Sequence, residues 1–433
     1  MKPKVTLFWF RRDLRLEDNR GLFEALKSGY PVLPIFIFDT NIIQGLDSSD
    51  RRVTFIYRCI SAIHDNLRKI NSGILCFHNT PQEAFDMLLK QYDVHGVYTN
   101  HDYEPYALQR DEQITSLLAA NQIPFHSFKD QVNFEKNDIL KDNGEPYTVY
   151  TPYSKKWKLH FRSEMVEPFP ISMKENKFFS HDRSIMPITE LGFKTVPCPD
   201  IHFEPNLQLI SEYHATRDIP SIQGTSHAGI HLRFGTISIR LLTKLALQSN
   251  EKYLNELIWR EFYQQILFHF PHVVHHSFRK EYDRIAWRND TKEFDCWCEG
   301  KTGYPIVDAG MRELNTTGWM HNRVRMIVAS FLTKHLLIDW RWGEAYFAKH
   351  LLDYDLASNN GGWQWAAGSG VDAAPYFRIF NPTLQTQKFD PQLNYIRHWI
   401  PELDSLQYPQ PIVVHEFARK RCLEHYQMAL KQN

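Results

Sequence analysis

The period of the hydrophobic pattern changes along this chain of 433 residues, and that change constrains its fold more than any other feature. Short apolar runs alternate with amphipathic segments in the first part, and the runs cover residues 5–10, 32–38, 73–78, 96–100 and 123–128. Continuous apolar runs separated by helical segments indicate parallel strands that are buried on both faces. We therefore predict a Rossmann-like α/β domain with a parallel five-stranded sheet over residues 1–130.

The rest of the chain divides into a connector and a helical part. The stretch 168–205 holds six prolines, which is typical of a long irregular segment, so we assign residues 131–205 to an interdomain linker. From residue 206 onward the apolar residues recur with a period near 3.6 and no strand pattern competes with them. This predicts an all-α domain over residues 206–433.

Composition excludes several classes of protein. The formal net charge is zero, so any nucleic-acid surface must be a local patch. Of the six cysteines only Cys296 and Cys298 are close in sequence, and they lack zinc-site spacing, so we predict free thiols in a reducing cytoplasm and no metal site. The N-terminus is no signal peptide and no apolar run has membrane-spanning length, so we expect no membrane partner.

One predicted helix carries a polar and aromatic stripe. Glu256, Trp259, Arg260 and Tyr263 stand at positions i, i+3, i+4 and i+7, which lie on one face of a helix. An acid, an indole and a phenol on one stripe suit a polar cavity that holds an aromatic ligand. The alternative is a surface Glu256–Arg260 ion pair beside a half-buried tryptophan.

Three further stretches contain candidate site residues. In "GWMHNRVRM", Asn322, Arg325 and Met326 share one helix face, and a mid-helix asparagine needs a reason; the alternative is solvated arginines and a core methionine. The turn in residues 217–235 offers backbone N–H groups and hydroxyls to a phosphate. In "DYDLASNNGGWQW" (353–365), a helix end at the glycines explains only part of the polar content.

These stretches resemble one family, the photolyase/cryptochrome flavoproteins, and most closely the class I cyclobutane pyrimidine dimer photolyases. The resemblance is carried by "FWFRRDLRLEDN", "GTSHAGIHLRFGTIS", "NELIWREFY", "EGKTGYPIVDAGMRELNTTGWMHNRVRM" and "DYDLASNNGGWQWAAGSGVDAAPYFRIFNP", and it spans essentially the whole chain. It implies a lyase that repairs UV-damaged DNA under blue light with fully reduced FAD. The enzyme would be a cytoplasmic monomer without an obligate protein partner.

The resemblance also implies the residues that bind FAD. Its phosphates would contact Tyr213, Thr225, Ser226, His227, Ala228 and Gly229, although Ala228 and Gly229 replace a usual Leu-Ser pair. The flavin ring and ribose would meet Asn322, Arg325, Asp353, Asp355 and Asn359, with the Asn359 amide donating a hydrogen bond near flavin N5. Trp287, Trp340 and Trp363 map onto the electron-transfer chain of the family; the alternative is that each is a core residue.

The remaining implied roles concern the lesion. Catalysis on the flipped dimer would involve Glu256, Asn322, Met326, Trp259 and Trp365. DNA contacts would come from Glu256, Trp259, Arg260, Tyr263, Asn322, Arg323 and Gln385, with Lys388 and Arg397 near phosphates. The antenna chromophore stays open between a deazaflavin-type molecule, flavin, folate and none. The main rival function is a blue-light photoreceptor (cryptochrome) without repair activity.

Overall fold

The computed structural model describes residues 1–174 and 177–431, and its contacts divide the chain into two compact units. The first unit comprises residues 1–135, 161–205 and 227–248. The second comprises residues 136–160, 206–226 and 249–433. Within the described ranges, every helix is too short or too polar to span a lipid bilayer.

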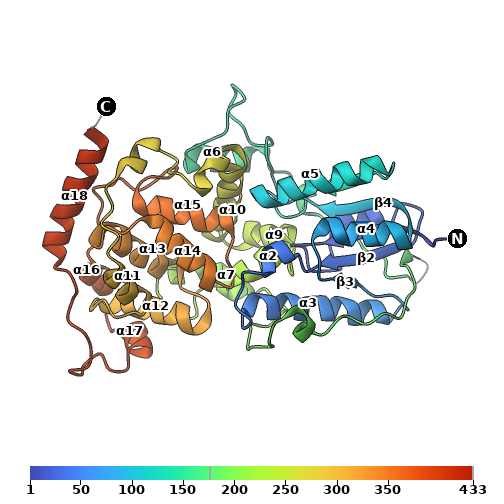
Figure 1. Cartoon of the computed structure of the whole chain (residues 1–433). Coiled ribbons are helices and arrows are strands. Elements are labelled where there is room, and N and C mark those ends of the chain that lie inside the picture. The colour runs from blue at the N-terminus through green and yellow to red at the C-terminus, as the bar shows by residue number, and fades with distance from the viewer. Residues whose placement is uncertain (175–176, 432–433) are drawn as a thin grey trace. The chain divides into compact units, whose positions relative to one another are not determined.

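A parallel five-stranded sheet forms the core of the first unit (Figure 1), which confirms the predicted α/β fold. Its strands, in the order β3-β2-β1-β4-β5, are β1 (Lys4–Phe10), β2 (Val32–Ile37), β3 (Leu75–Phe77), β4 (Asp93–Asn100) and β5 (Phe125–Phe128). The helices between them are α1 (Arg20–Ala25), α2 (Thr40–Ile43), α3 (Arg51–Arg68), α4 (Pro81–Gln91) and α5 (Pro105–Ala120). Figure 1 shows α3 and α5 on opposite sides of the sheet. Such an order with right-handed crossovers requires helices on both faces.

The first unit also contains segments from beyond the predicted α/β boundary. They include the short helices η1 (Ser163–Val166) and η3 (Ile188–Leu191), then α8 (Ala228–Phe234) and most of α9 (Ile239–Ser249). The predicted domain boundaries at 130 and 205 therefore differ from the observed division. Arg240 of α9 provides the physical reason, because it pairs with Asp18 at 2.9 Å and with Asp130 at 2.8 Å.

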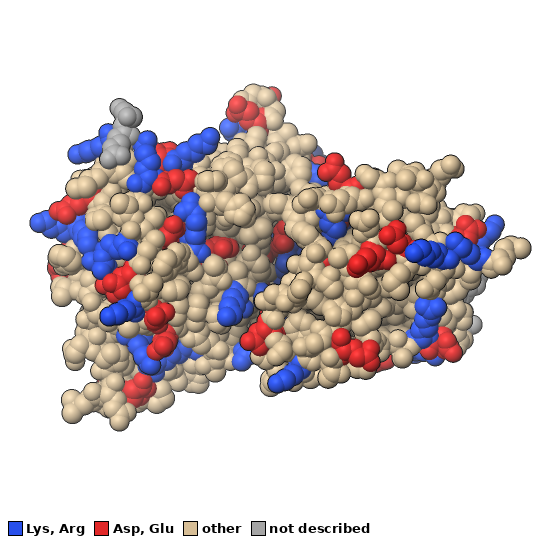
Figure 2. All heavy atoms as spheres, in the orientation of Figure 1, with Lys and Arg blue, Asp and Glu red and all other residues tan. Residues whose placement is uncertain are grey.

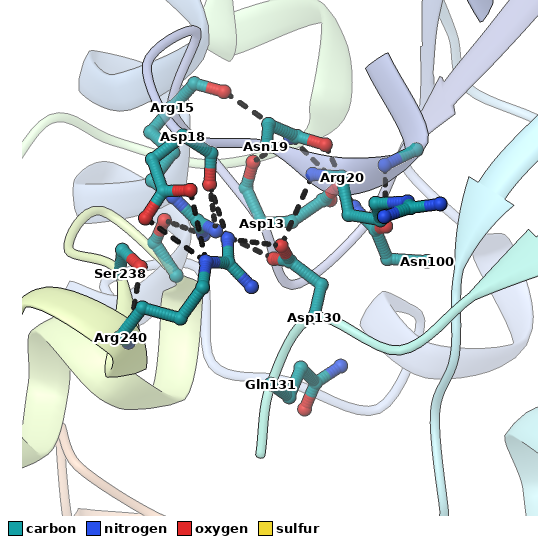
Figure 3. Close-up of polar contacts among 12 residues, drawn as sticks. Asp13, Arg15, Asp18, Asn19, Arg20, Asn100, Asp130, Gln131, Ser238 and Arg240 are labelled. Carbon is teal, nitrogen blue, oxygen red and sulfur yellow. Dashed lines mark hydrogen bonds and ion pairs between the residues drawn. The ribbon is translucent and has the colours of Figure 1, made fainter. Parts of the chain in front are cut away.

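A buried polar cluster surrounds this attachment (Figure 3). Asp130 lies between Arg15, at 2.6 Å, and Arg240, and its side chain is completely buried. Beside it, the Asn100 amide donates to Asp13 and to Asn19. Buried charges are tolerated when they are paired and hydrogen-bonded in this way. The cluster therefore fixes α9 to the sheet.

The second unit is helical, as predicted from residue 206. Its first helix, α6 (Tyr150–His160), comes from the predicted linker. The remaining elements are α7 (Leu207–Thr216), α10 (Glu251–His269), η4 (Pro271–Val274), η5 (Lys280–Arg284), α11 (Thr291–Cys298), α12 (Pro305–Thr317), α13 (Asn322–Ser330), η6 (Phe331–His335), α14 (Trp340–His350), α15 (Leu356–Ala367), α16 (Pro382–Phe389), α17 (Asn394–Trp399) and α18 (His415–Lys431). Its main core is built from α11 to α15 with α17. On the face shown in Figure 2, acidic and basic side chains are interspersed.

Candidate active site

A cavity of about 400 Å³ opens between the helices of the second unit. Small-molecule sites commonly have volumes of roughly 300–1,000 Å³. Twelve of the residues predicted from the sequence line this cavity: Glu256, Trp259, Arg260, Tyr263, Asn322, Arg325, Met326, Asp353, Asp355, Asn359, Trp363 and Trp365. Three stretches that are far apart in sequence thus form one site.

The first wall of the cavity is α10. Asn250 caps this helix by accepting from the backbone N–H groups of Lys252 and Tyr253. The predicted stripe lies on one face of the helix, as expected. However, Glu256 forms a close ion pair with Arg217. Arg217 was not among the site residues predicted from the sequence, and it also lines the cavity. Burial raises the pKa of Glu256, and the Arg217 guanidinium opposes that shift.

An aromatic stack supports Trp259 on this wall. The Tyr150 ring of α6 lies parallel to the indole, with 3.7 Å between centroids and 5° between planes. The Tyr150 hydroxyl donates to the Asn255 carbonyl at 2.9 Å, which fixes the ring to α10. No local pattern predicts this contact, because Tyr150 lies in the segment assigned to the linker.

The second wall is the beginning of α13. Asn322 is the first residue of the helix and His321 is its N-cap, so the expectation of a mid-helix asparagine was wrong. Arg325 donates to the Met320 carbonyl at 2.7 Å and to Asp353 at 2.9 Å, which holds its guanidinium at the cavity. The Asp353 carboxylate therefore has a protein cation as its direct partner.

The third wall is α15, which contains both glycines of "NNGG" in its interior. The expected helix end at these glycines was wrong, because the left-handed C-cap is Gly368. A Cβ at Gly361 would lie 2.2 Å from the Tyr263 ring, so Gly361 lets α15 approach α10 closely. A Cβ at Gly362 would meet no atom within 4 Å, and Gly362 lines the cavity. Gly361 therefore allows the two helices to pack closely, and Gly362 leaves space in the cavity.

The polar residues of this stretch have specific protein partners. Asp355 is the N-cap of α15 and accepts from the Ser358 N–H at 3.1 Å. The Asn359 amide nitrogen donates to the main-chain carbonyl of Glu344 at 3.1 Å and to its carboxylate at 2.8 Å. Since a carbonyl only accepts, the Asn359 nitrogen is committed and its oxygen is the free end. The Asn359 oxygen is therefore the atom left to accept from a ligand, and the contact of this amide with flavin N5 stays a prediction.

The three tryptophans assigned to electron transfer differ in their surroundings. Trp363 is 2% exposed and lines the cavity, Trp340 is buried at the start of α14, and Trp287 is partly buried against Tyr426. Among the described residues, the Trp363 ring contacts Phe347 and Trp297 and makes no ring contact with Trp340. Gly343 packs against the Trp363 ring and stands one helical turn after Trp340. A role in electron transfer stays a prediction.

The residues predicted for the FAD phosphates fall in both units. Tyr213 and Ser226 both contact Tyr253 of α10. The ring centroids of Tyr213 and Tyr253 are 5.2 Å apart, and the Ser226 hydroxyl lies 2.9 Å from the Tyr253 hydroxyl. Thr225 directly precedes Ser226 in the second unit, whereas His227, Ala228 and Gly229 belong to the first unit. Their roles stay predictions, as does that of Gln385 on α16, which is absent from the cavity lining.

Comparisons with known proteins match both parts of the chain. Residues 6–173 match the family model for DNA photolyase, and residues 253–428 match the model for the FAD-binding domain of DNA photolyase. A deoxyribodipyrimidine photo-lyase of Synechococcus sp. is 37% identical over 96% of this chain and 95% of its own length.

Two solved structures have the same architecture. A bacterial class III photolyase from Agrobacterium tumefaciens superposes with a TM-score of 0.87 at 32% identity, covering 100% of this chain and 99% of its own. An archaeal photolyase from Sulfolobus tokodaii, solved with two FAD molecules, gives a TM-score of 0.85 at 35% identity, covering 98% and 100%. With full-length relatives and both family models in agreement, the chain belongs to the DNA photolyase family.

Proposed function

We propose that the protein binds FAD in the cavity of the second unit and uses light to split cyclobutane pyrimidine dimers in DNA. The observation that carries this proposal is the convergence of twelve predicted residues on one cavity. The lining fits a flavin: Gly362 leaves open space beside α15, and Arg325 and the Asn359 oxygen supply a donor and an acceptor. When bound in its reduced form, FAD supplies one electron after absorbing light.

The protein residues would hold the cofactor as follows. Arg325, fixed by Asp353, would provide a cation for the flavin, and the Asn359 oxygen would provide an acceptor. Tyr213, Thr225 and Ser226 provide hydroxyl groups for the phosphates. Trp363, at the cavity wall, would pass electrons towards the cavity together with Trp340 and Trp287.

On the lesion side, the dimer must leave the base stack to reach the cavity, as the photolyases in general flip their target. Trp259, supported by Tyr150, and Trp365 would stack on the flipped dimer; such stacking is worth about 1–3 kcal/mol per base. Glu256 would hydrogen-bond the dimer; burial raises its pKa and the Arg217 guanidinium opposes that shift. Asn322 and Met326 would contact the edge of the dimer.

DNA phosphates would be bound by Arg323, and Arg260, Tyr263 and Gln385 would make further contacts with the DNA. Binding should therefore weaken as salt rises. Splitting the dimer would leave the cofactor in its starting oxidation state, so the reaction would be redox-neutral overall. We further place the enzyme in the cytoplasm as a monomer; its six free cysteines agree with a reducing compartment.

A repair assay tests the function. Purified protein with chemically reduced FAD is mixed with an oligonucleotide that carries one dimer, and repair is followed under blue light and in darkness. We expect repair only in the light. Absence of light-dependent repair with reduced FAD bound would overturn the proposal, and retention of intact dimers with a light-induced conformational change would favour a photoreceptor.

A further inference from the structure

Four residues of alternating charge connect the cavity to its rim. Glu256 pairs with Arg217, the Arg217 Nε atom lies 3.9 Å from Asp218, and Asp218 pairs with Arg323 at 2.7 Å. Arg217 and Asp218 are consecutive residues at the C-terminal end of α7. One dipeptide thus holds both the acid proposed to bind the lesion and the arginine proposed to bind a phosphate.

The Asp218–Arg323 pair is suited to exchange. Nε and one Nη of Arg323 share a single oxygen of Asp218, so the pair lacks the two-oxygen fork that makes such contacts strong. Asp218 keeps 43% of its side chain exposed, and exposed ion pairs contribute little. A phosphate can therefore replace the carboxylate without a large loss.

The backbone beneath the dipeptide is held in place, so side-chain movement alone is needed. The Thr216 hydroxyl donates to the Gly224 carbonyl at 3.2 Å and closes the loop between them. A Cβ on Gly224 would lie 2.7 Å from Thr216, which shows how closely the loop ends approach. The 3.9 Å separation of Arg217 and Asp218 leaves them unbonded but near enough to pair.

We propose that Glu256, Arg217, Asp218 and Arg323 form an ion-pair relay through which the lesion releases Arg323 for a DNA phosphate. A dimer that hydrogen-bonds Glu256 frees Arg217, Arg217 then attracts Asp218, and Arg323 becomes available to the backbone. Undamaged DNA does not reach Glu256, so its phosphate must compete with Asp218. The relay rests on the proposed function, and it makes Asp218 a specificity-determining residue.

The test compares binding of two oligonucleotides, identical except for one dimer, in darkness and over a series of salt concentrations. Asp218→Asn should tighten binding of the undamaged oligonucleotide by up to about five-fold, the most that an exposed ion pair contributes. Its plot of log affinity against log salt should steepen by up to about 0.9, one phosphate contact. Affinity for the dimer should change much less, so discrimination falls.

A double-mutant cycle separates the relay from a general charge effect. Glu256→Gln also frees Arg217, so it should tighten binding of undamaged DNA. If the residues act in one relay, the double variant Asp218→Asn/Glu256→Gln binds undamaged DNA no more tightly than Asp218→Asn alone. Additive effects, or equal changes for both oligonucleotides, would overturn the relay.

A matched control and the wild-type protein complete the design. Asp290→Asn removes the same charge from an acid that is 40% exposed and keeps a residue suited to cap α11, so it should leave both affinities unchanged. If the wild type neither prefers nor repairs the dimer, the proposed function fails. If the wild type does both and the variants do not alter discrimination, only the relay fails.

Discussion

The two units use the same chemical groups, carboxylates and guanidiniums, in opposite ways. In the first unit Asp130 is fully buried between Arg15 and Arg240, whose side chains are 9% and 6% exposed. In the second unit Arg217 and Glu256 remain 23% and 32% exposed and border a cavity. Pairs that are buried and satisfied on every side hold a fold together, whereas pairs around an open space can exchange partners for a ligand.

The largest expected effect is the loss of stability when a fully buried carboxylate is removed. Asp130→Ala leaves two buried guanidiniums without their shared carboxylate and should lower the free energy of unfolding by about 3–5 kcal/mol. Asp353→Ala, at the cavity, should cost only about 1 kcal/mol, because the partly exposed Arg325 can be hydrated. Urea unfolding measures both, and equal losses would contradict the distinction.

A pair of tryptophans extends the comparison to aromatic residues. Trp363 lines the cavity, whereas Trp9 of β1 is also 2% exposed but packs against Phe85 in the sheet unit. Trp363→Phe should abolish photoreduction of oxidised FAD and spare repair after chemical reduction, because only the electron relay is lost. Trp9→Phe should leave photoreduction intact. Normal photoreduction in Trp363→Phe would show that this indole is a core residue.

Two buried acids, Glu313 in the second unit and Asp130 in the first, should respond to pH with opposite signs. Burial raises the pKa of Glu313 to about 7 from 4.5, so the folded protein keeps a proton that the unfolded chain loses. Its contribution to stability is present below pH 4.5 and is lost as pH rises towards 7. For Asp130, burial raises the pKa but Arg15 and Arg240 outweigh it and lower the pKa, so its stabilisation is lost as pH falls below 3.8.

Glu313→Gln tests that sign. The free energy of unfolding of the variant minus that of the wild type should increase by about 1–3 kcal/mol as the pH rises from 5 to 7. The amide introduced by this substitution would still accept from the Tyr395 hydroxyl, which lies 2.7 Å from the Glu313 carboxylate. Denaturant unfolding at several pH values checks this, and a pH-independent difference would contradict it.

The smallest expected effect concerns the Tyr150–Trp259 stack. Tyr150→Leu should weaken dimer binding about two- to ten-fold, since an aromatic pair is worth about 0.5–1.5 kcal/mol. Tyr150→Phe keeps the stack, loses the bond to Asn255 and should bind almost as well as wild type. Binding in darkness is the measurement, with FAD content as the control; equal weakening by both variants would assign the effect to the hydroxyl.

Local patterns predicted much of this molecule. Apolar runs located the five strands, and the i, i+3, i+4 spacing placed Glu256, Trp259 and Tyr263 on one wall of the cavity. What they missed depends on contacts between distant segments. Arg217 and Tyr150 join the site through partners 39 and 109 residues away, and local spacing does not reveal such pairs.

The same reason explains why the two compact units differ from the predicted domain ranges and why the helix does not end at the glycine pair. Arg240 attaches α9 to the first unit through Asp18 and Asp130, which lie 222 and 110 residues away in sequence. Gly361 resembles a helix terminator, but its role is to admit the Tyr263 ring from another helix. A glycine pair alone does not distinguish a helix end from a close helix crossing.

We place FAD in the cavity of the second unit, and filling that cavity tests this claim. Gly362→Leu places a side chain where no atom lies within 4 Å of the Cβ position, and it should stabilise α15 by about 1 kcal/mol. We expect a folded protein that lacks flavin absorbance and light-dependent repair, with Gly362→Ala intermediate. A Gly362→Leu protein that carries stoichiometric FAD and repairs dimers at the wild-type yield would contradict the claim.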